Sequence, residues 1–260
     1  MLNQTALITG AARRLGRAMA LELAALGYDI VLHYAGSKTE AEETAAEIRA
    51  LGARVNCHQA DLLVEAETKA LAQAPLAFDQ PWTVLVNNAS IFEYDNIKTA
   101  TRDSWDRHFD SNLRAPFILT QAFAAQIETG AIDNSGELVA TGNIINLVDQ
   151  RVRKLTPEFM TYTLAKSALW TLTQTSARAL APDIRVNAIG PGPTLRGARQ
   201  SVAHFENQRQ ATILKRGANP GDITAALRFI LASPSLTGQL LCIDGGQHLG
   251  WQTPDIQGVE

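Results

Sequence analysis

The sequence predicts an α/β fold: one doubly wound domain whose seven-stranded parallel sheet is covered by helices on both faces. Strand-like and helix-like segments alternate along the whole chain, and the first strand-like run ends in a glycine-bearing turn that opens a helix. Such alternation favours right-handed crossovers and therefore parallel strands. With 260 residues, 46% of them hydrophobic, and no repeat or linker, residues 1–260 are expected to form a single domain.

The strand-like runs are short, apolar and separated by helical patterns. We expect strands at Thr5–Thr9, Asp29–His33, Arg54–His58, Thr83–Asn87, Asn143–Val148, Ile184–Ile189 and Gln239–Ile243. We expect helices at Leu15–Leu26, Thr39–Leu51, Glu65–Ala74, from after Asp103 to Ile127, at Phe159–Leu180 and at Pro220–Leu231. The segment Glu128–Ser135 gives no clear pattern.

Composition excludes several classes of function. The formal charge of −3 argues against a nucleic acid or an anionic membrane as the partner. Met1–Gly10 lacks a basic stretch followed by a long apolar one, so we expect no secretory signal, and no apolar run approaches a membrane span of about 18 residues. Cys57 and Cys242 lie in strand-like runs and are expected to be buried thiols rather than metal ligands. A cytoplasmic protein without a metal site fits these features.

The turn after the first strand has the features of a phosphate site. Gly10 and Gly16 flank it, and a glycine turn into a helix brings backbone N–H groups up to a diphosphate. Arg13, Arg14 and Arg17 surround the helix start, where they would repel each other unless an anion joined them. The alternative is a solvated basic helix end beside glycines that only permit tight packing.

The residues after the second strand bear on the choice of cofactor. An acidic residue here would bind the ribose 2′-hydroxyl of NAD, but no acid occurs before Glu40. His33, Ser37 and Lys38 offer donors instead, which together with Arg13 favours NADP(H). The alternative is an ordinary polar loop in which Ser37 caps the next helix.

Polar residues also follow the later strands, whose carboxyl ends border the ligand crevice of an open α/β sheet. Asp61 could accept from the adenine amino group or cap a helix. The fourth strand ends in Asn87-Asn88-Ala89-Ser90, and the fifth delivers Asp149, which could equally be a loop cap. Asn112 precedes Pro116, which is expected to kink its helix and leave a carbonyl free to hold water.

Tyr162 and Lys166 are the candidate catalytic pair. Residues four apart share one helical face, so the phenol and the ammonium point the same way. A cation beside a phenol lowers a pKa that is otherwise about 10, so Tyr162 could exchange a proton near neutral pH. Alone, the pair could be a solvated helix face.

Together these motifs resemble the short-chain dehydrogenase/reductase family, a family of Rossmann-type enzymes. Thr9-Gly10 with Gly16, Asn87-Asn88-Ala89, Asn112, Tyr162 with Lys166, Pro191-Gly192 and Asp244-Gly245-Gly246 occur in the family's order and spacing. The resemblance implies that the cofactor is bound by Gly10, Arg13, Arg14, Leu15, Gly16, His33, Ser37, Asp61, Leu62, Asn88, Ala89, Ser90, Tyr162, Lys166, Pro191 and Gly192. It implies that catalysis involves Asn112, which anchors a water connected to Lys166, and the pair Tyr162 and Lys166.

Within that family the sequence looks most like the pteridine reductases. Arg14 replaces the middle glycine of the turn, Asp149 stands where most members have a catalytic serine, and Ser90 and Phe92 follow the Asn-Asn-Ala. In pteridine reductases the matching Phe stacks on the pterin, and the matching Arg and Ser contact cofactor phosphate and pterin. The resemblance implies NADPH, a homotetramer, and a substrate loop and helix at about 193–217. Gly36 departs from it, because those enzymes often have a basic residue there.

The sequence therefore predicts an NADPH-dependent pterin reductase acting on a dihydropteridine or dihydrofolate. Its substrate site would comprise Arg14, Ser90, Phe92, Asp149 and Tyr162, with Asp149 joining Tyr162 in handling the proton. An NADP-dependent reductase of ketones or 3-oxoacyl compounds is the alternative. A non-catalytic NADP(H)-binding protein is a third interpretation, against which the Tyr162/Lys166 pair counts.

Overall fold

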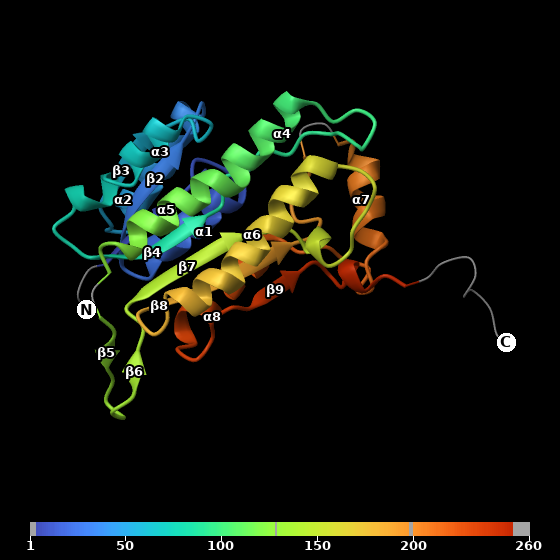
Figure 1. Cartoon of the computed structure of the whole chain (residues 1–260). Helices are drawn as coiled ribbons and strands as arrows, with labels where there is room; N and C mark the ends of the chain where they lie inside the picture. Colours follow the sequence, from blue (N-terminus) through green and yellow to red (C-terminus); the bar gives the residue numbers. More distant parts are fainter. Residues whose placement is uncertain (1–3, 128, 198–199, 252–260) are drawn as a thin grey trace.

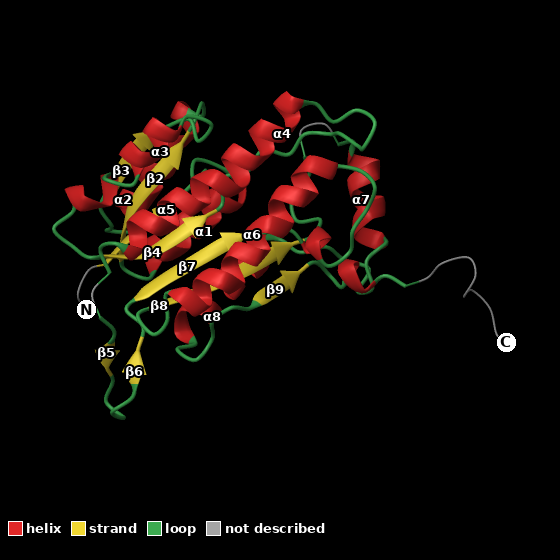
Figure 2. Ribbon diagram, in the orientation of Figure 1, coloured by secondary structure: helices red, strands yellow, loops and turns green. Residues whose placement is uncertain are grey.

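A seven-stranded parallel sheet forms the centre of the molecule, as predicted (Figures 1 and 2). The computed structural model describes residues 4–127, 129–197 and 200–251. The strands run in the order β3-β2-β1-β4-β7-β8-β9, so the direction of winding reverses between β1 and β4. Ligands in such sheets bind outside the carboxyl ends of the strands at that point. The strands are β1 (Gln4–Ile8), β2 (Tyr28–Tyr34), β3 (Val55–Gln59), β4 (Trp82–Asn87), β7 (Gly142–Leu147), β8 (Ile184–Pro191) and β9 (Leu240–Ile243).

Helices cover both faces of the sheet (Figure 2). They are α1 (Arg14–Ala25), α2 (Lys38–Ala50), α3 (Glu65–Leu71), α4 (Arg102–Phe109), α5 (Ala115–Ala124), α6 (Met160–Ala179), α7 (Val202–Gln210) and α8 (Pro220–Ala232). Short 3₁₀ turns occur at Ala74–Ala77, Gln150–Val152 and Gln247–Leu249. Among the helices described, none combines the length and the apolar character that a membrane crossing requires.

Alternate residues of each strand pack into two separate hydrophobic cores, one on each face of the sheet. In β1, Ala6 and Ile8 pack with α1, α2 and α8, whereas Leu7 between them packs with α3, α5 and α6. Successive side chains of a strand point to opposite faces, so a strand buried on both sides reads as a continuous apolar run. This is why the strands were visible in the sequence as short apolar runs rather than as alternating patterns.

The helix expected from after Asp103 to Ile127 is divided. α4 ends at Phe109, a π-helical turn spans Asp110–Arg114, and α5 starts at Ala115. Pro116 lies in the first turn of α5, where a missing N–H costs least. The irregular backbone was correctly associated with Pro116, but it precedes the proline and takes the form of a π turn that contains Asn112.

A small β-hairpin, absent from the predicted elements, projects from the sheet between α5 and β7 (Figure 1). β5 (Ala131–Ile132) pairs with β6 (Leu138–Val139), and an Asp133 carboxylate oxygen accepts hydrogen bonds from the backbone N–H groups of Ser135 and Glu137. Each strand has only two residues, which is too short for a periodic pattern to show.

Gly16 lies where α1 packs tightly against the first turn, and a substitution there can measure that packing. A Cβ added there would lie 2.1 Å from the Gly10 carbonyl oxygen, so we expect Gly16→Ala to force the backbone apart and to destabilise the protein by about 1–3 kcal/mol. Gly36→Ala is the matched control, because a Cβ at Gly36 meets nothing within 4 Å. Urea unfolding of both variants measures the difference, and equal midpoints would contradict this packing.

Candidate active site

A large cavity opens at the carboxyl ends of β1, β2 and β4. Its volume is about 1080 Å³, at the upper end of the range for ligand pockets and suited to an extended molecule. Most residues predicted to bind a cofactor line it: Gly10, Arg13, Arg14, Leu15, Gly16, His33, Ser37, Asp61, Leu62, Asn88, Ala89, Ser90 and Gly192. Pro191 ends β8 immediately before Gly192. Of the residues predicted to act in the chemistry, Asp149, Tyr162 and Lys166 lie together in a separate cluster, whereas Asn112 bonds the backbone of Ile91, which lines the cavity.

The ends of β1 and β4 are joined by Thr9 and Asn88. The Thr9 hydroxyl accepts from the backbone N–H groups of Asn88 and Ala89, both at 2.9 Å. The Asn88 amide donates to the carbonyl oxygens of Thr9 (2.8 Å) and Gly10 (3.2 Å). Gly10 itself has a φ of +63°, which glycine adopts without strain. The asparagine predicted as a cofactor residue therefore also holds the turn in shape.

His33 does not offer the free hydrogen-bond donor expected of it. Its side chain is buried, Nδ1 accepts from the Gly10 N–H at 3.0 Å, and Nε2 lies 3.0 Å from the Ala60 carbonyl oxygen. Burial lowers the pKa of His33 to about 4, so the ring is neutral near pH 7. The prediction that His33 offers a donor to a 2′-phosphate is wrong for this structure: both nitrogens are engaged, and the ring supports the Gly10 turn.

The three arginines of the first turn have separate partners. Arg17 pairs with Glu47 (2.6 Å), whereas Arg13 lines the cavity and lies 3.8 Å from Glu40. Of the three, only Arg13 and Arg14 line the cavity where a cofactor anion could bind. Ser37 stands at the N-cap of α2, yet its side chain makes no capping hydrogen bond. Its hydroxyl and the start of α2 thus face the cavity where an anion would be favoured.

Asp61 lies in the turn before α3 and does not cap that helix, and its contact with adenine stays a prediction. Its carboxylate accepts from the Leu63 N–H at 3.0 Å, in the turn before α3, and the residue also lines the cavity. The N-cap position of α3 belongs to Val64 instead. Asp61 therefore forms the turn without capping the helix itself.

Arg14 reaches across the cavity to the other half of the chain. It has a φ of +57°, a backbone conformation that non-glycine residues rarely adopt. Its guanidinium donates to the carbonyl oxygens of Leu195 (3.0 Å) and Arg196 (2.8 Å). The residue that replaces the middle glycine therefore connects the first turn to the segment after β8.

The phenol of Tyr162 donates a hydrogen bond to the carboxylate of Asp149. Tyr162 lies in the first turn of α6 and Asp149 follows β7, and the Oη–Oδ2 distance is 2.9 Å. The other oxygen of Asp149 accepts from the Arg151 N–H at 2.8 Å. Lys166, one turn along α6, is buried; its Nζ donates to the Leu147 carbonyl oxygen at 2.7 Å and lies 5.9 Å from the centre of the Tyr162 ring.

Burial dominates the protonation of this cluster. It raises the pKa of Tyr162 well above 10, and the charge of Asp149 raises it further. It also raises the pKa of Asp149 and lowers that of Lys166 to about 8. The expectation that Lys166 lowers the phenol's pKa is wrong here, because desolvation and the adjacent carboxylate both favour the neutral phenol.

Aromatic rings form one wall beside the phenol. Phe92 is 44% exposed, meets Tyr162 edge-on at 4.7 Å between ring centres, and stacks on Phe159 at 4.3 Å. The Arg151 guanidinium lies 5.2 Å from the Phe159 ring centre. Phe159 and Arg151 were not predicted as site residues. Phe159 is the N-cap residue of α6, three residues before Tyr162, and that proximity was the available signal.

A buried polar network supports the start of α6. Asp95 accepts from the Thr161 N–H (3.1 Å) and the Ser104 hydroxyl (3.0 Å), and it also bonds the Thr161 hydroxyl. His108 Nδ1 lies 2.7 Å from that hydroxyl, and its Nε2 accepts from the Glu93 N–H. The network fixes both Tyr162 and the Phe92–Glu93 stretch, and nothing in the separate motifs indicated it.

Asn112 is fully engaged with the backbone of one residue. Its side-chain oxygen accepts from the Ile91 N–H (2.8 Å) and its nitrogen donates to the Ile91 carbonyl (2.9 Å). The side chain therefore orients the Ser90–Phe92 stretch. A water connected to Lys166 would have to be held by backbone groups of the π turn, and that role stays a prediction.

Comparisons with known proteins agree with this geometry. The family model described as Enoyl-(Acyl carrier protein) reductase matches residues 10–248. A 3-oxoacyl-[acyl-carrier-protein] reductase of Staphylococcus epidermidis is 32% identical over 257 residues, covering 95% of this chain and all of that protein. The crystal structure of FolM alternative dihydrofolate reductase 1 from Brucella suis in complex with NADP superposes with a TM-score of 0.89 at 40% identity, over 98% of both chains.

A further structure, a short chain dehydrogenase from Burkholderia cenocepacia in complex with NADP, is 30% identical with a TM-score of 0.84, over 95% of this chain and 98% of that one. These matches span nearly the whole chain, including the cavity and the Tyr162 cluster. The chain belongs to the short-chain dehydrogenase/reductase family.

Proposed function

We propose that this protein is an NADPH-dependent reductase of a pterin, a dihydropteridine or dihydrofolate. The observation that carries the proposal is the hydrogen bond of 2.9 Å between the Tyr162 phenol and the buried Asp149 carboxyl group, beside the partly exposed ring of Phe92. The similarity to a Brucella suis protein named as an alternative dihydrofolate reductase supports it.

NADP(H) is the cofactor, and the cavity fits it. Gly10 and Gly16 line the cavity at the start of α1, where a diphosphate is favoured, and Arg13 with the Ser37 hydroxyl can bind a 2′-phosphate. Two of the similar structures were crystallised with NADP. When bound, NADPH supplies the hydride.

The residues around Tyr162 hold the proton that must accompany the hydride. If Asp149 is ionised, loss of the phenol proton would leave two adjacent negative charges in a buried site, which is costly. The raised pKa of Asp149 makes a protonated carboxyl group accessible, so Tyr162 and Asp149 can together deliver one proton and keep another. Lys166, with a pKa of about 8, can stabilise the negative charge that remains.

Asp149 also favours a pterin as the substrate. A carboxyl group can accept from the amino and ring N–H groups of a pterin, and Phe92 offers a ring on which a flat heterocycle can stack. A carboxylate at this place would repel the negative charge that develops on a ketone oxygen. The same position thus discriminates between the two substrate classes.

Reduction of a ketone or 3-oxoacyl compound is the second candidate. It is favoured by the 32% identity to a 3-oxoacyl-[acyl-carrier-protein] reductase over essentially that protein's whole length. Tyr162 and Lys166 would serve such a reaction equally well, because neither recognises the ring of the substrate.

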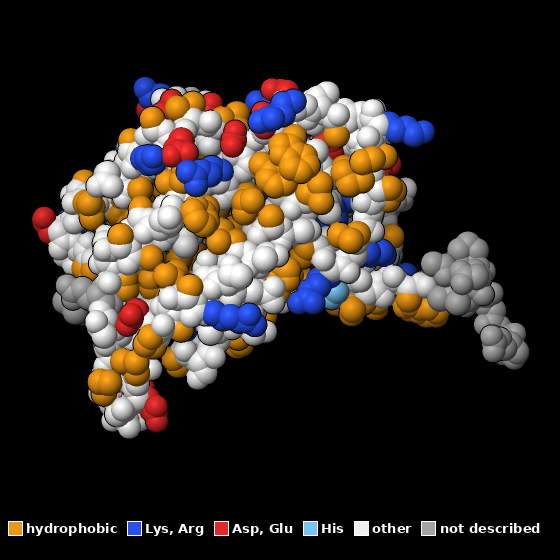
Figure 3. Space-filling view, viewed as in Figure 1, with side chains coloured by type: hydrophobic (Ala, Val, Ile, Leu, Met, Phe, Trp, Pro, Cys, Tyr) orange, Lys and Arg blue, Asp and Glu red, His pale blue; other side chains and the backbone are white. Residues whose placement is uncertain are grey.

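A homotetramer is part of the proposal. Apolar side chains gather over α4, α5 and α6 on the face seen in Figure 3. Trp105 and Phe109 stack at 4.3 Å, and Trp105, Phe117 and Leu164 are 43%, 37% and 42% exposed. An apolar surface of this kind supports association with further copies of the chain.

The cofactor preference should depend on Arg13. We expect wild-type protein to bind NADPH more tightly than NADH, and Arg13→Ala to weaken NADPH binding about tenfold or more while leaving NADH binding unchanged, because only NADPH carries the 2′-phosphate. Fluorescence titration measures both. Arg17→Ala is the control, since Arg17 pairs with Glu47. Equal affinity of the wild type for both cofactors would show that no 2′-phosphate site exists.

Tyr162→Phe should abolish most turnover. The substitution preserves the ring but removes the transferable proton, so we expect a loss of about 10²–10⁴-fold in kcat with nearly unchanged NADPH affinity. Tyr28→Phe, at the start of β2, should leave turnover unchanged. Steady-state NADPH oxidation is the measurement. Activity within a few-fold of wild type would place the proton donor elsewhere.

Asp149→Ser should separate the two substrate classes. The loss of a charged hydrogen bond to a buried ligand costs about 1.5–3 kcal/mol, so kcat/KM for dihydrobiopterin should fall by about tenfold or more. Activity on a reactive diketone should persist or rise, because serine can hydrogen-bond a ketone oxygen. Asp133→Ser in the β5–β6 hairpin is the control. An unchanged ratio of the two activities would refute the pterin assignment and leave a carbonyl reductase.

A further inference from the structure

α7 has no buried apolar residue to anchor it. None of its residues, Val202–Gln210, is buried. Most helices in globular proteins are stabilised by packing of an apolar face. The position of α7 must therefore depend on other contacts, among them those made by Arg209 near its C-terminal end.

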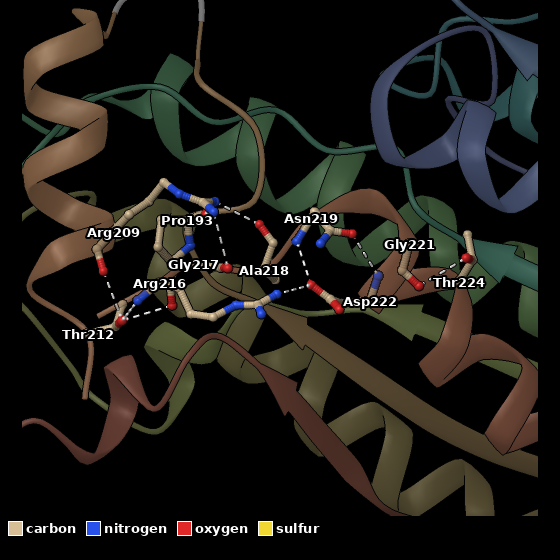
Figure 4. A network of polar contacts seen from close by, with 10 residues as sticks. All are labelled: Pro193, Arg209, Thr212, Arg216, Gly217, Ala218, Asn219, Gly221, Asp222 and Thr224. Carbon is tan, nitrogen blue, oxygen red and sulfur yellow. Dashed lines mark hydrogen bonds and ion pairs between the residues drawn. The ribbon is translucent and has the colours of Figure 1, made fainter. Parts of the chain in front are cut away.

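Arg209 of α7 binds both ends of the segment 193–217 (Figure 4). Its Nη1 donates to the carbonyl oxygens of Pro193 (2.9 Å), just after β8, and Ala218 (2.8 Å), just before α8. Its Nη2 donates to the Gly217 carbonyl at 3.3 Å. Among the residues described, no carboxylate forms an ion pair with Arg209. The guanidinium is thus satisfied by backbone oxygens from both ends of the segment.

The backbone is closely packed around this contact. A Cβ at Gly217 would lie 2.1 Å from the Pro193 carbonyl oxygen and 2.8 Å from Arg209 Nη1. The buried Thr212 hydroxyl lies 2.9 Å from the carbonyl oxygens of both Arg209 and Arg216 and holds the turn after α7 (Figure 4). The backbones at the two ends of the segment, at Pro193 and Gly217, are therefore in close contact, and the hydrogen bonds of Arg209 connect them.

The contact of Arg209 with Pro193, Gly217 and Ala218, called the clasp below, lies next to the wall of the cavity. Pro193 stands between Gly192 and Thr194, both of which line the cavity. Leu195 follows, and its carbonyl oxygen accepts from Arg14 of the first turn. One guanidinium therefore holds this stretch from the α7 side and another from the cofactor side. A shift of Pro193 would move α7 relative to the Tyr162 cluster.

We propose that Arg209 is a positioning residue for the substrate side of the site, which closes the base of the segment 193–217 and so sets the place of α7. Lysine cannot replace it fully, because one ammonium nitrogen cannot take the places of both Nη1, which donates to Pro193 and Ala218, and Nη2, which donates to Gly217. The proposal rests on the segment bordering the substrate of the reductase, and it does not depend on whether that substrate is a pterin or a ketone.

The test compares Arg209→Met with Arg209→Lys. Methionine keeps an extended side chain but donates nothing, so we expect KM for the substrate to rise about tenfold with kcat and the NADPH dissociation constant changed less than about threefold. Amide hydrogen exchange across 202–210 should become at least about tenfold faster, while the strands β1 and β4 keep their protection. Arg209→Lys should be intermediate in both measurements. Arg228→Met, on the neighbouring α8, is the matched control.

Two results would overturn the proposal. Arg209→Met with wild-type exchange across α7 would show that the clasp does not hold the helix. The second result is a lower melting temperature and a weaker NADPH affinity in Arg209→Met, together with the higher KM, and no recovery in Arg209→Lys. It would show that Arg209 has a general role in folding. Hydrogen exchange needs no substrate, so it still decides the question if pterin reduction itself is not observed.

Discussion

The burial of three ionisable groups in one cluster is the constraint on which the site depends. Asp149, Tyr162 and Lys166 come from the end of β7 and one face of α6, and each is withdrawn from water. Desolvation moves every one of them toward its neutral form, so the cluster is stable only because its members are hydrogen-bonded to each other or to the backbone. The surrounding elements, including the Asp95 network and the π turn, hold these donors and acceptors in position.

Much of the fold was predictable because its information is local. Each buried strand is a short apolar run, and the polar residues that follow β1, β4 and β7 meet at one edge of a parallel sheet by topology alone. The spacing of Tyr162 and Lys166 likewise follows from one helix. For this reason the cavity is lined by residues such as Gly10, Ser37 and Asn88 that the sequence had already singled out.

What escaped prediction depends on long-range contacts and on burial. His33 was predicted to be a donor because it ends the second strand shortly before Ser37 and Lys38, but its environment is set by Gly10 and by Ala60, which follows β3. The effect of Lys166 on Tyr162 was argued from charge alone, whereas desolvation, which a sequence does not display, reverses the sign of the shift. Arg209 appears in the sequence as one more polar residue of a helix, and only the fold brings it against the backbone at both ends of its own segment.

The carboxyl group of Asp149 connects these observations to specificity. A serine at this place would be neutral at every working pH and would leave the phenol's pKa governed mainly by burial. A carboxyl group couples its own proton to that of Tyr162, so the two titrate as a pair rather than as separate groups. Such a pair is poorly suited to a developing alkoxide, which needs a donor and no second negative charge. It is well suited to a heterocycle that presents N–H donors to the carboxyl group and takes up a proton at a ring nitrogen. That match of charge and hydrogen bonding is the physical basis for proposing a pterin as the substrate of this reductase.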